Sequence, residues 1–317
     1  MNSRSEAAAR AAFETLIDYA GLYPPAELGV DAAVAEYDDA RASAAAWMLG
    51  RFIAGTQRAG AVAAAWRARG TGGALRLSAI AAVESDARRW FDSLRGALDA
   101  IVALRANPEV SVDALEIPLA VPVSARETYD APVAQLRAAL DRAGLGDLPV
   151  YVELPGHARR DELLPQTMAT LARLRFGAKI RCGGLVAEAF PSVDAVAGFI
   201  AAAAAEGVAF KATAGLHHPV RHFNAATGFV MHGFLNLLAA AAFAPSSNAA
   251  ELREIVAEED PGAFAFDDSG FVWRGRRANL DDLRRMRATA FVGYGSCSFS
   301  EPVDDLTALG MLPAALA

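Results

Sequence analysis

The chain has little lysine, little cysteine and no long apolar run. Of its 30 basic residues only Lys179 and Lys211 are lysines. The two cysteines, Cys182 and Cys297, lie far apart without CxxC or Cys/His spacing, which excludes a disulfide framework or a zinc module and favours a reducing compartment. The longest apolar stretches are about ten residues and rich in alanine, and the charged first residues lack the apolar core of a signal peptide. We therefore expect a cytoplasmic protein without membrane contact.

The charge balance also limits the partners. The net charge is −7 and the isoelectric point is about 5.3, and the arginines are interspersed with acidic residues. Nucleic-acid surfaces need basic patches that neutralise phosphates, so nucleic-acid binding is excluded. A small-molecule ligand is the expected partner.

Short β-like runs alternate with helical patterns through nearly the whole chain, which indicates parallel strands joined by crossover helices. Helical apolar spacing covers 86–104, 129–143, 161–175 and 192–206, with Asp161 and Ser192 as expected N-caps. We predict an α/β fold, a TIM-type (β/α)8 barrel forming one domain over 1–317. An open doubly wound sheet is the alternative, but no GxGxxG follows the first strand. The eight predicted strands are 18–24, 47–55, 75–83, 114–121, 149–155, 178–184, 208–215 and 290–298.

One long segment, 245–289, precedes the eighth strand where a short loop would suffice. Its pattern predicts a helix over 248–259, a hairpin over 264–275 that turns at Asp268-Ser269-Gly270, and a second helix from Asn279. We expect this insertion to serve packing or subunit contact, and a lid over the barrel mouth is the alternative.

Charged residues fall on the inward face of strands four to seven, because their apolar neighbours must face the helices. Burying a charge costs several kcal/mol per ion, and an apolar core would fill the same space at less cost. A catalytic or binding site is therefore favoured over a network that only fills the barrel. The inward residues are Glu116, Glu153, Lys179, Arg181, Lys211 and Thr213.

The loops after strands seven and eight carry glycine, serine, histidine and arginine. In barrel enzymes these loops often bind phosphate, because backbone N–H groups at glycines can approach an anion. Ordinary turns are the alternative. With Arg181 and Thr213, the predicted anion-binding residues are Gly215, His218, Arg221, Gly295, Ser296 and Ser298.

Four of the five histidines, His217, His218, His222 and His232, lie just after Lys211. We assign His217 as a general acid or base at the barrel mouth and His232 to packing. The segment has no carboxylate or cysteine at ligand spacing, so no metal site and no cofactor is predicted. A divalent metal stays an alternative, because Glu153 of the fifth strand could approach the histidines. Both cysteines are expected to be structural, because the sequence shows no paired base.

A lysine attacks carbonyls when burial or a neighbouring cation lowers its pKa, and Arg181 and Lys211 are such neighbours for Lys179. The arrangement resembles the deoxyribose-phosphate aldolase group of class I aldolases, barrels whose Schiff-base lysine lies on strand six and whose second lysine lies on strand seven. By strand position, the resemblance implies Lys179 as nucleophile and Lys211 as its perturbing neighbour. By motif, the family's lysine-threonine-serine-threonine-glycine run of strand six is similar to residues 211–215, which we place on strand seven.

The leading hypothesis is an aldolase-like lyase that forms an imine between one of the two lysines and a small anionic carbonyl substrate, with Glu116, Glu153 or His217 moving protons. A second hypothesis keeps the enzyme without the imine: the lysines and Arg181 clamp an anion for phosphoribosyl transfer or metal-assisted enolisation. Residues 211–216 are similar to the lysine-threonine-threonine-proline-glycine-leucine run of quinolinate phosphoribosyltransferases. A third hypothesis is a barrel that binds a metabolite without catalysis. A homo-oligomer is compatible with all three.

Overall fold

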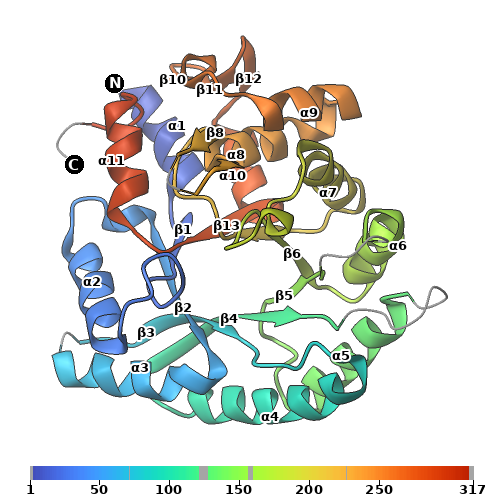
Figure 1. Ribbon diagram of the computed structural model, residues 1–317. Helices are drawn as coiled ribbons and strands as arrows, with labels where there is room; N and C mark the ends of the chain where they lie inside the picture. The colour runs from blue at the N-terminus through green and yellow to red at the C-terminus, as the bar shows by residue number, and fades with distance from the viewer. Residues whose placement is uncertain (1–2, 71, 121–127, 156–159, 226, 314–317) are drawn as a thin grey trace.

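A computed structural model describes residues 3–70, 72–120, 128–155, 160–225 and 227–313 of the chain, and it contains a closed barrel of eight parallel strands (Figure 1). Each predicted strand overlaps an observed one, so the predicted (β/α)8 fold is confirmed; residue 121, the last of the predicted fourth strand, lies outside the described residues. The barrel strands are β1 (Ile17–Tyr19), β2 (Leu49–Gly55), β3 (Leu75–Ile80), β4 (Val110–Pro118), β5 (Val150–Glu153), β6 (Gly177–Arg181), β7 (Phe210–Thr213) and β13 (Phe291–Ser296).

Helices surround this barrel, one after each strand (Figure 1). The Ser192 side chain accepts a hydrogen bond from the backbone N–H of Ala195 at 3.1 Å, which confirms the predicted N-cap. Asp161 was wrongly predicted as an N-cap, because the helix already begins at Arg160. The surrounding helices are α2 (Val30–Ala42), α3 (Thr56–Arg69), α4 (Ala87–Arg105), α5 (Asp130–Arg142), α6 (Arg160–Arg173), α7 (Val193–Glu206), α8 (Phe234–Phe243) and α11 (Ser300–Ala308), and α1 (Ser3–Phe13) precedes β1.

Among the described residues, one helical stretch, Ala187–Glu206, is long and apolar enough to cross a membrane by length and composition alone. Val196, Phe199 and Ile200 are buried, whereas the exposed positions of the stretch are glycine, alanine, serine or charged residues. Packing on the barrel therefore explains the apolar character of this helix.

The segment before β13 forms a helix, a small antiparallel sheet and a second helix. The predicted hairpin is present, and a third strand that the sequence analysis missed pairs with it. The segment packs on α1: the Phe13 and Phe266 rings lie 5.2 Å apart, and Arg287 donates a hydrogen bond to the Glu14 carbonyl at 3.1 Å. Its elements are α9 (Ala249–Ala257), β10 (Phe264–Asp267), β11 (Gly270–Trp273), β12 (Arg276–Ala278) and α10 (Leu280–Thr289).

This position contradicts the lid alternative. The segment joins the end of a helix to the start of a strand, and such connections lie at the amino-terminal end of a barrel, opposite the mouth. No described residue of the segment lines the cavity at the mouth.

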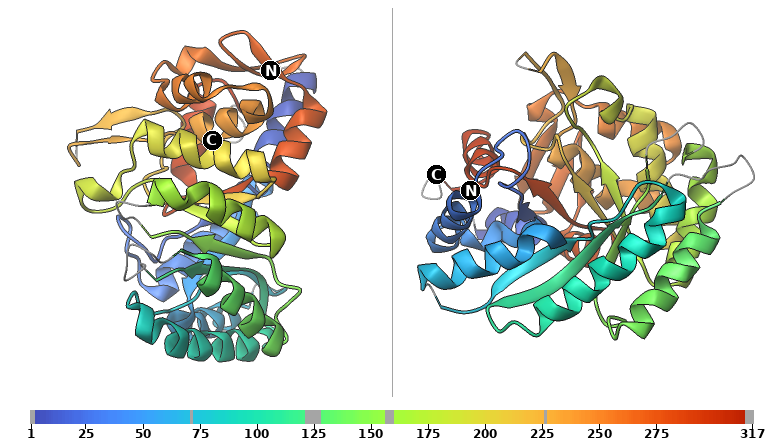
Figure 2. Two further views of the ribbon diagram at one scale, coloured as in Figure 1. Left: turned by 90° about the vertical axis from the view of Figure 1, so that its right-hand side faces the viewer. Right: turned by 60° about the horizontal axis from the view of Figure 1, so that its bottom comes forward.

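A second hairpin, β8 (His222–Asn224) with β9 (Phe229–Met231), follows β7 and was not predicted. It projects from the body of the molecule (Figure 2). A connection after a strand lies at the carboxyl end of the barrel, so this hairpin borders the mouth.

Candidate functional site

Strand register brings the predicted charges into one layer inside the barrel. Lys179 on β6 lies beside Lys211 on β7, and Glu153 on β5 lies beside Lys179 on its other side. Glu116 on β4 projects into the same space, paired in register with Ile80 on β3. Alternation along each strand therefore directed these side chains as predicted.

Glu116 joins the two lysines. One carboxylate oxygen, Oε2, lies 2.5 Å from the Lys179 Nζ, and the other, Oε1, pairs with the Lys211 Nζ. Lys179 also contacts the Glu153 carboxylate at 2.9 Å. Lys211 also contacts the Asp18 carboxylate at 2.6 Å. Each lysine thus has two carboxylate partners, and Glu116 is common to both.

Asp18 and Ser78 belong to this layer but were missed by sequence reasoning. The Ser78 hydroxyl donates to Glu116 at 2.7 Å and accepts from Lys211 at 3.0 Å. Asp18 accepts a hydrogen bond from the backbone N–H of Arg51 at 2.6 Å. The space beside Asp18 depends on Gly50, where an added Cβ would lie 2.2 Å from the Asp18 carboxylate. The same alternation could have found Ser78, whose position in the run 75–80 has the parity of an inward residue.

The carboxylates set the pKa values of this layer. Burial alone would lower the pKa of Lys179, but the Glu116 and Glu153 carboxylates outweigh burial and raise it above its ordinary value. Burial would also lower the pKa of Lys211, but the Asp18 and Glu116 carboxylates outweigh burial and raise it. Burial would raise the pKa of Glu116, but the two ammonium groups lower it. The expectation that neighbouring cations lower the lysine pKa was wrong, because each lysine contacts two carboxylates, which raise its pKa.

A cavity of about 370 Å³ opens at the mouth, and Lys179 and Glu116 are among the residues that line it. Lys179 is 3 % exposed, whereas Lys211 is fully buried within the same layer and does not line the cavity. The predicted site residues that do line it are Glu116, Lys179, Arg181, Thr213, Gly215, His217, His218 and Gly295.

Four further predicted residues have other surroundings. Arg221 pairs with Glu259, away from the cavity. Ser296 is buried in β13, and the Ser298 hydroxyl accepts a hydrogen bond from the backbone N–H of Glu301 at 3.2 Å. The structure therefore does not bring Arg221, Ser296 or Ser298 to the cavity, because each lies on a turn or strand face directed elsewhere. Glu153 lines a second cavity between β6 and α7, which it shares with Lys179 and Arg181.

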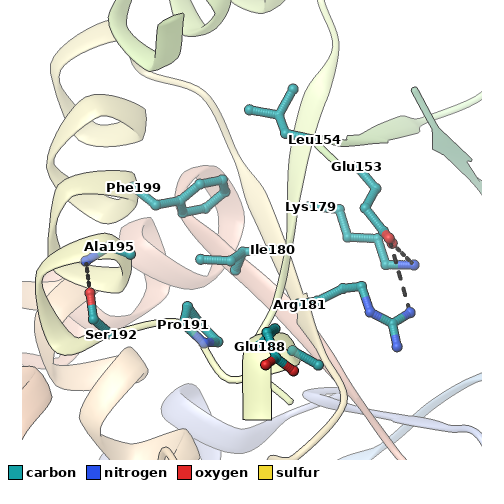
Figure 3. A pocket seen from close by; sticks show the side chains of 11 residues that line it. Glu153, Leu154, Lys179, Ile180, Arg181, Glu188, Pro191, Ser192, Ala195 and Phe199 are labelled. Carbon is teal, nitrogen blue, oxygen red and sulfur yellow. Dashed lines mark hydrogen bonds and ion pairs between the residues drawn. The ribbon is translucent and has the colours of Figure 1, made fainter. Parts of the chain in front are cut away.

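Figure 3 shows this second cavity and the two faces of β6. Ile180 points toward Phe199 of α7, while Lys179 and Arg181 point away from that helix, with the Glu153 carboxylate between them. The Arg181 guanidinium lies 4.0 Å from Glu153 and its side chain is 54 % exposed. Arg181 therefore keeps most of its hydrogen-bonding capacity for a ligand.

His217 has two partners at the mouth. Its Nδ1 lies 3.6 Å from the Cys297 sulfur and 3.5 Å from the Glu301 carboxylate. Burial lowers the pKa of His217 despite Glu301, and burial raises the pKa of the Cys297 thiol. The histidine and thiol are therefore both neutral near pH 7. Cys297 does have a base beside it, contrary to the sequence expectation, because the two residues come from different loops.

The other histidines differ in role. His218 pairs with Asp305 at 2.7 Å at the rim. His232 is buried and hydrogen-bonds the Pro191 carbonyl at 2.8 Å, as a packing residue would. Within the described part of the chain, no group of three or more histidine, cysteine or acidic side chains is placed to hold a metal ion.

Comparison with known proteins gives one kind of match. No protein-family model and no curated protein sequence matches the chain. Among solved structures, the chain is similar to a deoxyribose phosphate aldolase from Aeropyrum pernix, described as having a unique tetrameric structure, with a TM-score of 0.51 and 13 % sequence identity over 98 % of this chain and 94 % of that one. At this identity the match shows a shared fold, and the chain resembles that aldolase as a (β/α)8 barrel.

Proposed function

We propose that this chain is an aldolase-like lyase in which Lys179 forms an imine with a small carbonyl compound that carries a carboxylate. One observation supports the choice of Lys179: it lines the cavity, whereas Lys211 does not and is fully buried in contact with Glu116 and Asp18. The fold shared with an aldolase is compatible with the proposal. The strand-position correspondence of the sequence resemblance assigns the same lysine.

Imine formation needs the neutral amine first. In the resting site Lys179 is an ammonium ion held by Glu116 and Glu153, so a proton must pass to a carboxylate or to water before the amine attacks the carbonyl carbon. The carbinolamine then loses water and leaves a protonated imine on Lys179. This cation takes the place of the ammonium between the same two carboxylates, which stabilise its charge.

After the imine forms, the bond that breaks joins the carbon next to the imine carbon to the hydroxyl-bearing carbon beyond it, which in a 4-hydroxy-2-oxo acid is the bond between the third and fourth carbons. A base removes the proton of the hydroxyl group, the carbon–carbon bond breaks, an aldehyde leaves, and its bonding electrons form an enamine on Lys179. His217 suits this base role, because its lowered pKa leaves it neutral near pH 7 and it lines the same cavity. Protonation of the enamine carbon and hydrolysis of the imine then regenerate the lysine.

The anionic group of the substrate is assigned to Arg181. Its guanidinium is half exposed, two residues beyond Lys179 on the same strand face. In a 2-oxo acid the carboxylate is adjacent to the imine carbon, where it would pair with the Arg181 guanidinium. Thr213, Gly215 and Gly295 offer further hydrogen-bonding groups at the mouth, and His218 also lines the cavity but is paired with Asp305.

The anion-clamp alternative finds less support. A clamp needs cations without partners, but both lysines already have two carboxylate partners each.

The proposal needs no cofactor. Two free cysteines fit the reducing cytoplasm predicted from the sequence, and a homo-oligomer remains part of the proposal.

The test is exchange of hydrogen for deuterium at the methyl group of pyruvate in D₂O, followed by proton NMR. Enamine formation on the enzyme catalyses this exchange without any aldehyde partner. We expect exchange with the wild type, none with Lys179→Arg, and full exchange with Arg173→Lys, which places a lysine on the exposed end of α6. Exchange by Lys179→Arg at the wild-type rate would refute imine catalysis at this residue.

A further inference from the structure

The cavity above Lys179 has an apolar wall, which consists of Tyr23, Ile53, Ile80, Leu185, Phe190 and Met231. These residues come from the loop after β1, from β2 and β3, from the loop after β6 and from the end of β9. They therefore enclose the mouth from several sides.

The wall begins at the level of the charged layer, since Ile53 is the register partner of Ser78. Ile53 reaches across the barrel toward β13, since a Cβ added to Gly295 would lie 3.0 Å from the Ile53 Cδ1 atom. Ile80 is the register partner of Glu116. A substrate bound to Lys179 would therefore extend from the charged layer into apolar surroundings.

The outer part of the wall is only partly covered. Phe190 packs on Phe229 of the β8–β9 hairpin, with ring centroids 4.9 Å apart. Leu185 lines the cavity but is 77 % exposed. An apolar ligand body would cover the exposed surface of Leu185 and gain free energy by doing so.

The polar groups at the rim disfavour a phosphorylated ligand there. His217 and His218 are each paired with a carboxylate, from Glu301 and Asp305. A phosphate dianion at the rim would meet these two carboxylates, and Arg221 lies elsewhere. Asn224 and Thr227 are the neutral polar residues of the hairpin that line the cavity.

We infer that the aldehyde released or accepted by this enzyme has an apolar, unphosphorylated body, aliphatic or aromatic, that lies on this wall while its carbonyl carbon faces the enamine on Lys179. This inference rests on the proposed function and names its second substrate. The bond balance is that of the aldol step: the enamine carbon bonds to the aldehyde carbon, and the aldehyde oxygen takes a proton from an acid at the mouth. The cavity volume of about 370 Å³ fits a ligand of the size of a phenylalkyl aldehyde bonded to a 2-oxo acid.

The test compares aldehydes with pyruvate as the common donor. We expect kcat/KM for 3-phenylpropanal to exceed the value for glyceraldehyde or glyceraldehyde 3-phosphate by about tenfold or more, since matched apolar groups in a pocket carry such factors. Phe190→Ala is expected to reduce that preference severalfold. The matched control is Phe223→Ala, because Phe223 is 64 % exposed on the same hairpin and does not line the cavity.

The outcomes separate the two proposals. Imine formation with a preference for the phosphorylated or hydroxylated aldehyde would overturn the inference and leave the proposed function intact. If no imine forms, ligand-observed NMR with the unreactive 3-phenylpropan-1-ol decides: binding weakened by Phe190→Ala and not by Phe223→Ala supports an apolar ligand, and no binding overturns it.

Discussion

Replacement of Glu116 by glutamine tests the charged layer most sharply. The change keeps the size of a side chain that is fully buried but removes the negative charge shared by two ammonium groups. One lysine must then either stay charged with a single carboxylate partner or lose its proton. At about 1.36 kcal/mol per pH unit, deprotonating a lysine of ordinary pKa 10.5 at pH 7 costs about 4.8 kcal/mol. Breaking a buried ion pair typically costs about 3–5 kcal/mol, so the two routes predict a similar loss of stability.

The pH dependence of that loss follows from the direction of the shifts. The raised pKa of Lys179 and Lys211 gives stability that is present below pH 10.5 and lost as the pH rises through the folded value. The lowered pKa of Glu116 gives stability that is present above pH 4.5 and lost as the pH falls. If one lysine is neutral in Glu116→Gln, the deficit shrinks to about 2 kcal/mol at pH 9.

Urea unfolding of the wild type and of Glu116→Gln at pH 7 and pH 9 measures the loss of unfolding free energy at each pH. Glu206→Gln is the control, because Glu206 is exposed at the end of α7 and should change stability by less than about 0.5 kcal/mol. A deficit below about 1 kcal/mol for Glu116→Gln at pH 7 would refute the view that Glu116 holds both lysines charged.

Three further predictions follow from the same contacts. Because carboxylates raise the pKa of Lys179, pyruvate exchange should speed up as the pH rises from 7 to 10, and Glu153→Gln should move the rise to lower pH; a flat profile would contradict this. Gly50→Ala should cost about 1–3 kcal/mol in urea unfolding by displacing the Asp18 carboxylate, whereas Gly60→Ala in α3, with open space around it, should be neutral or stabilising; equal effects would count against the packing described here. Cys297 should react slowly with iodoacetamide at pH 7, because burial raises its pKa; rapid alkylation with an ionised thiol would show otherwise.

The fold could be predicted because each strand carried its own signal. Apolar runs alternating with helical spacing required parallel strands with crossover helices, and the eighth strand was recognisable beyond a long insertion. The β8–β9 hairpin and β12 were missed, because each of these strands has three residues and those of β8 and β12 are largely polar. The position of the insertion at the amino-terminal end of the barrel follows from its place between a helix and the next strand, an argument that the sequence analysis did not use.

The site was predictable only in part. Alternation correctly directed Glu116, Lys179 and Lys211 into the barrel, since it depends on neighbours along one strand. The pKa direction was wrong because it depends on which groups meet across strands, and Asp18 comes from the far end of the chain. For the same reason the contact between His217 and Cys297 was invisible in the sequence.

Borohydride reduction of the protein in the presence of pyruvate, followed by intact mass and peptide mapping, identifies the lysine that forms the imine. We predict a single reduced adduct on Lys179, which lines the cavity, and none on Lys211, which is fully buried. An adduct on Lys211 would contradict the assignment of the nucleophile, and no adduct with pyruvate or any other 2-oxo acid or aldehyde would contradict imine chemistry altogether.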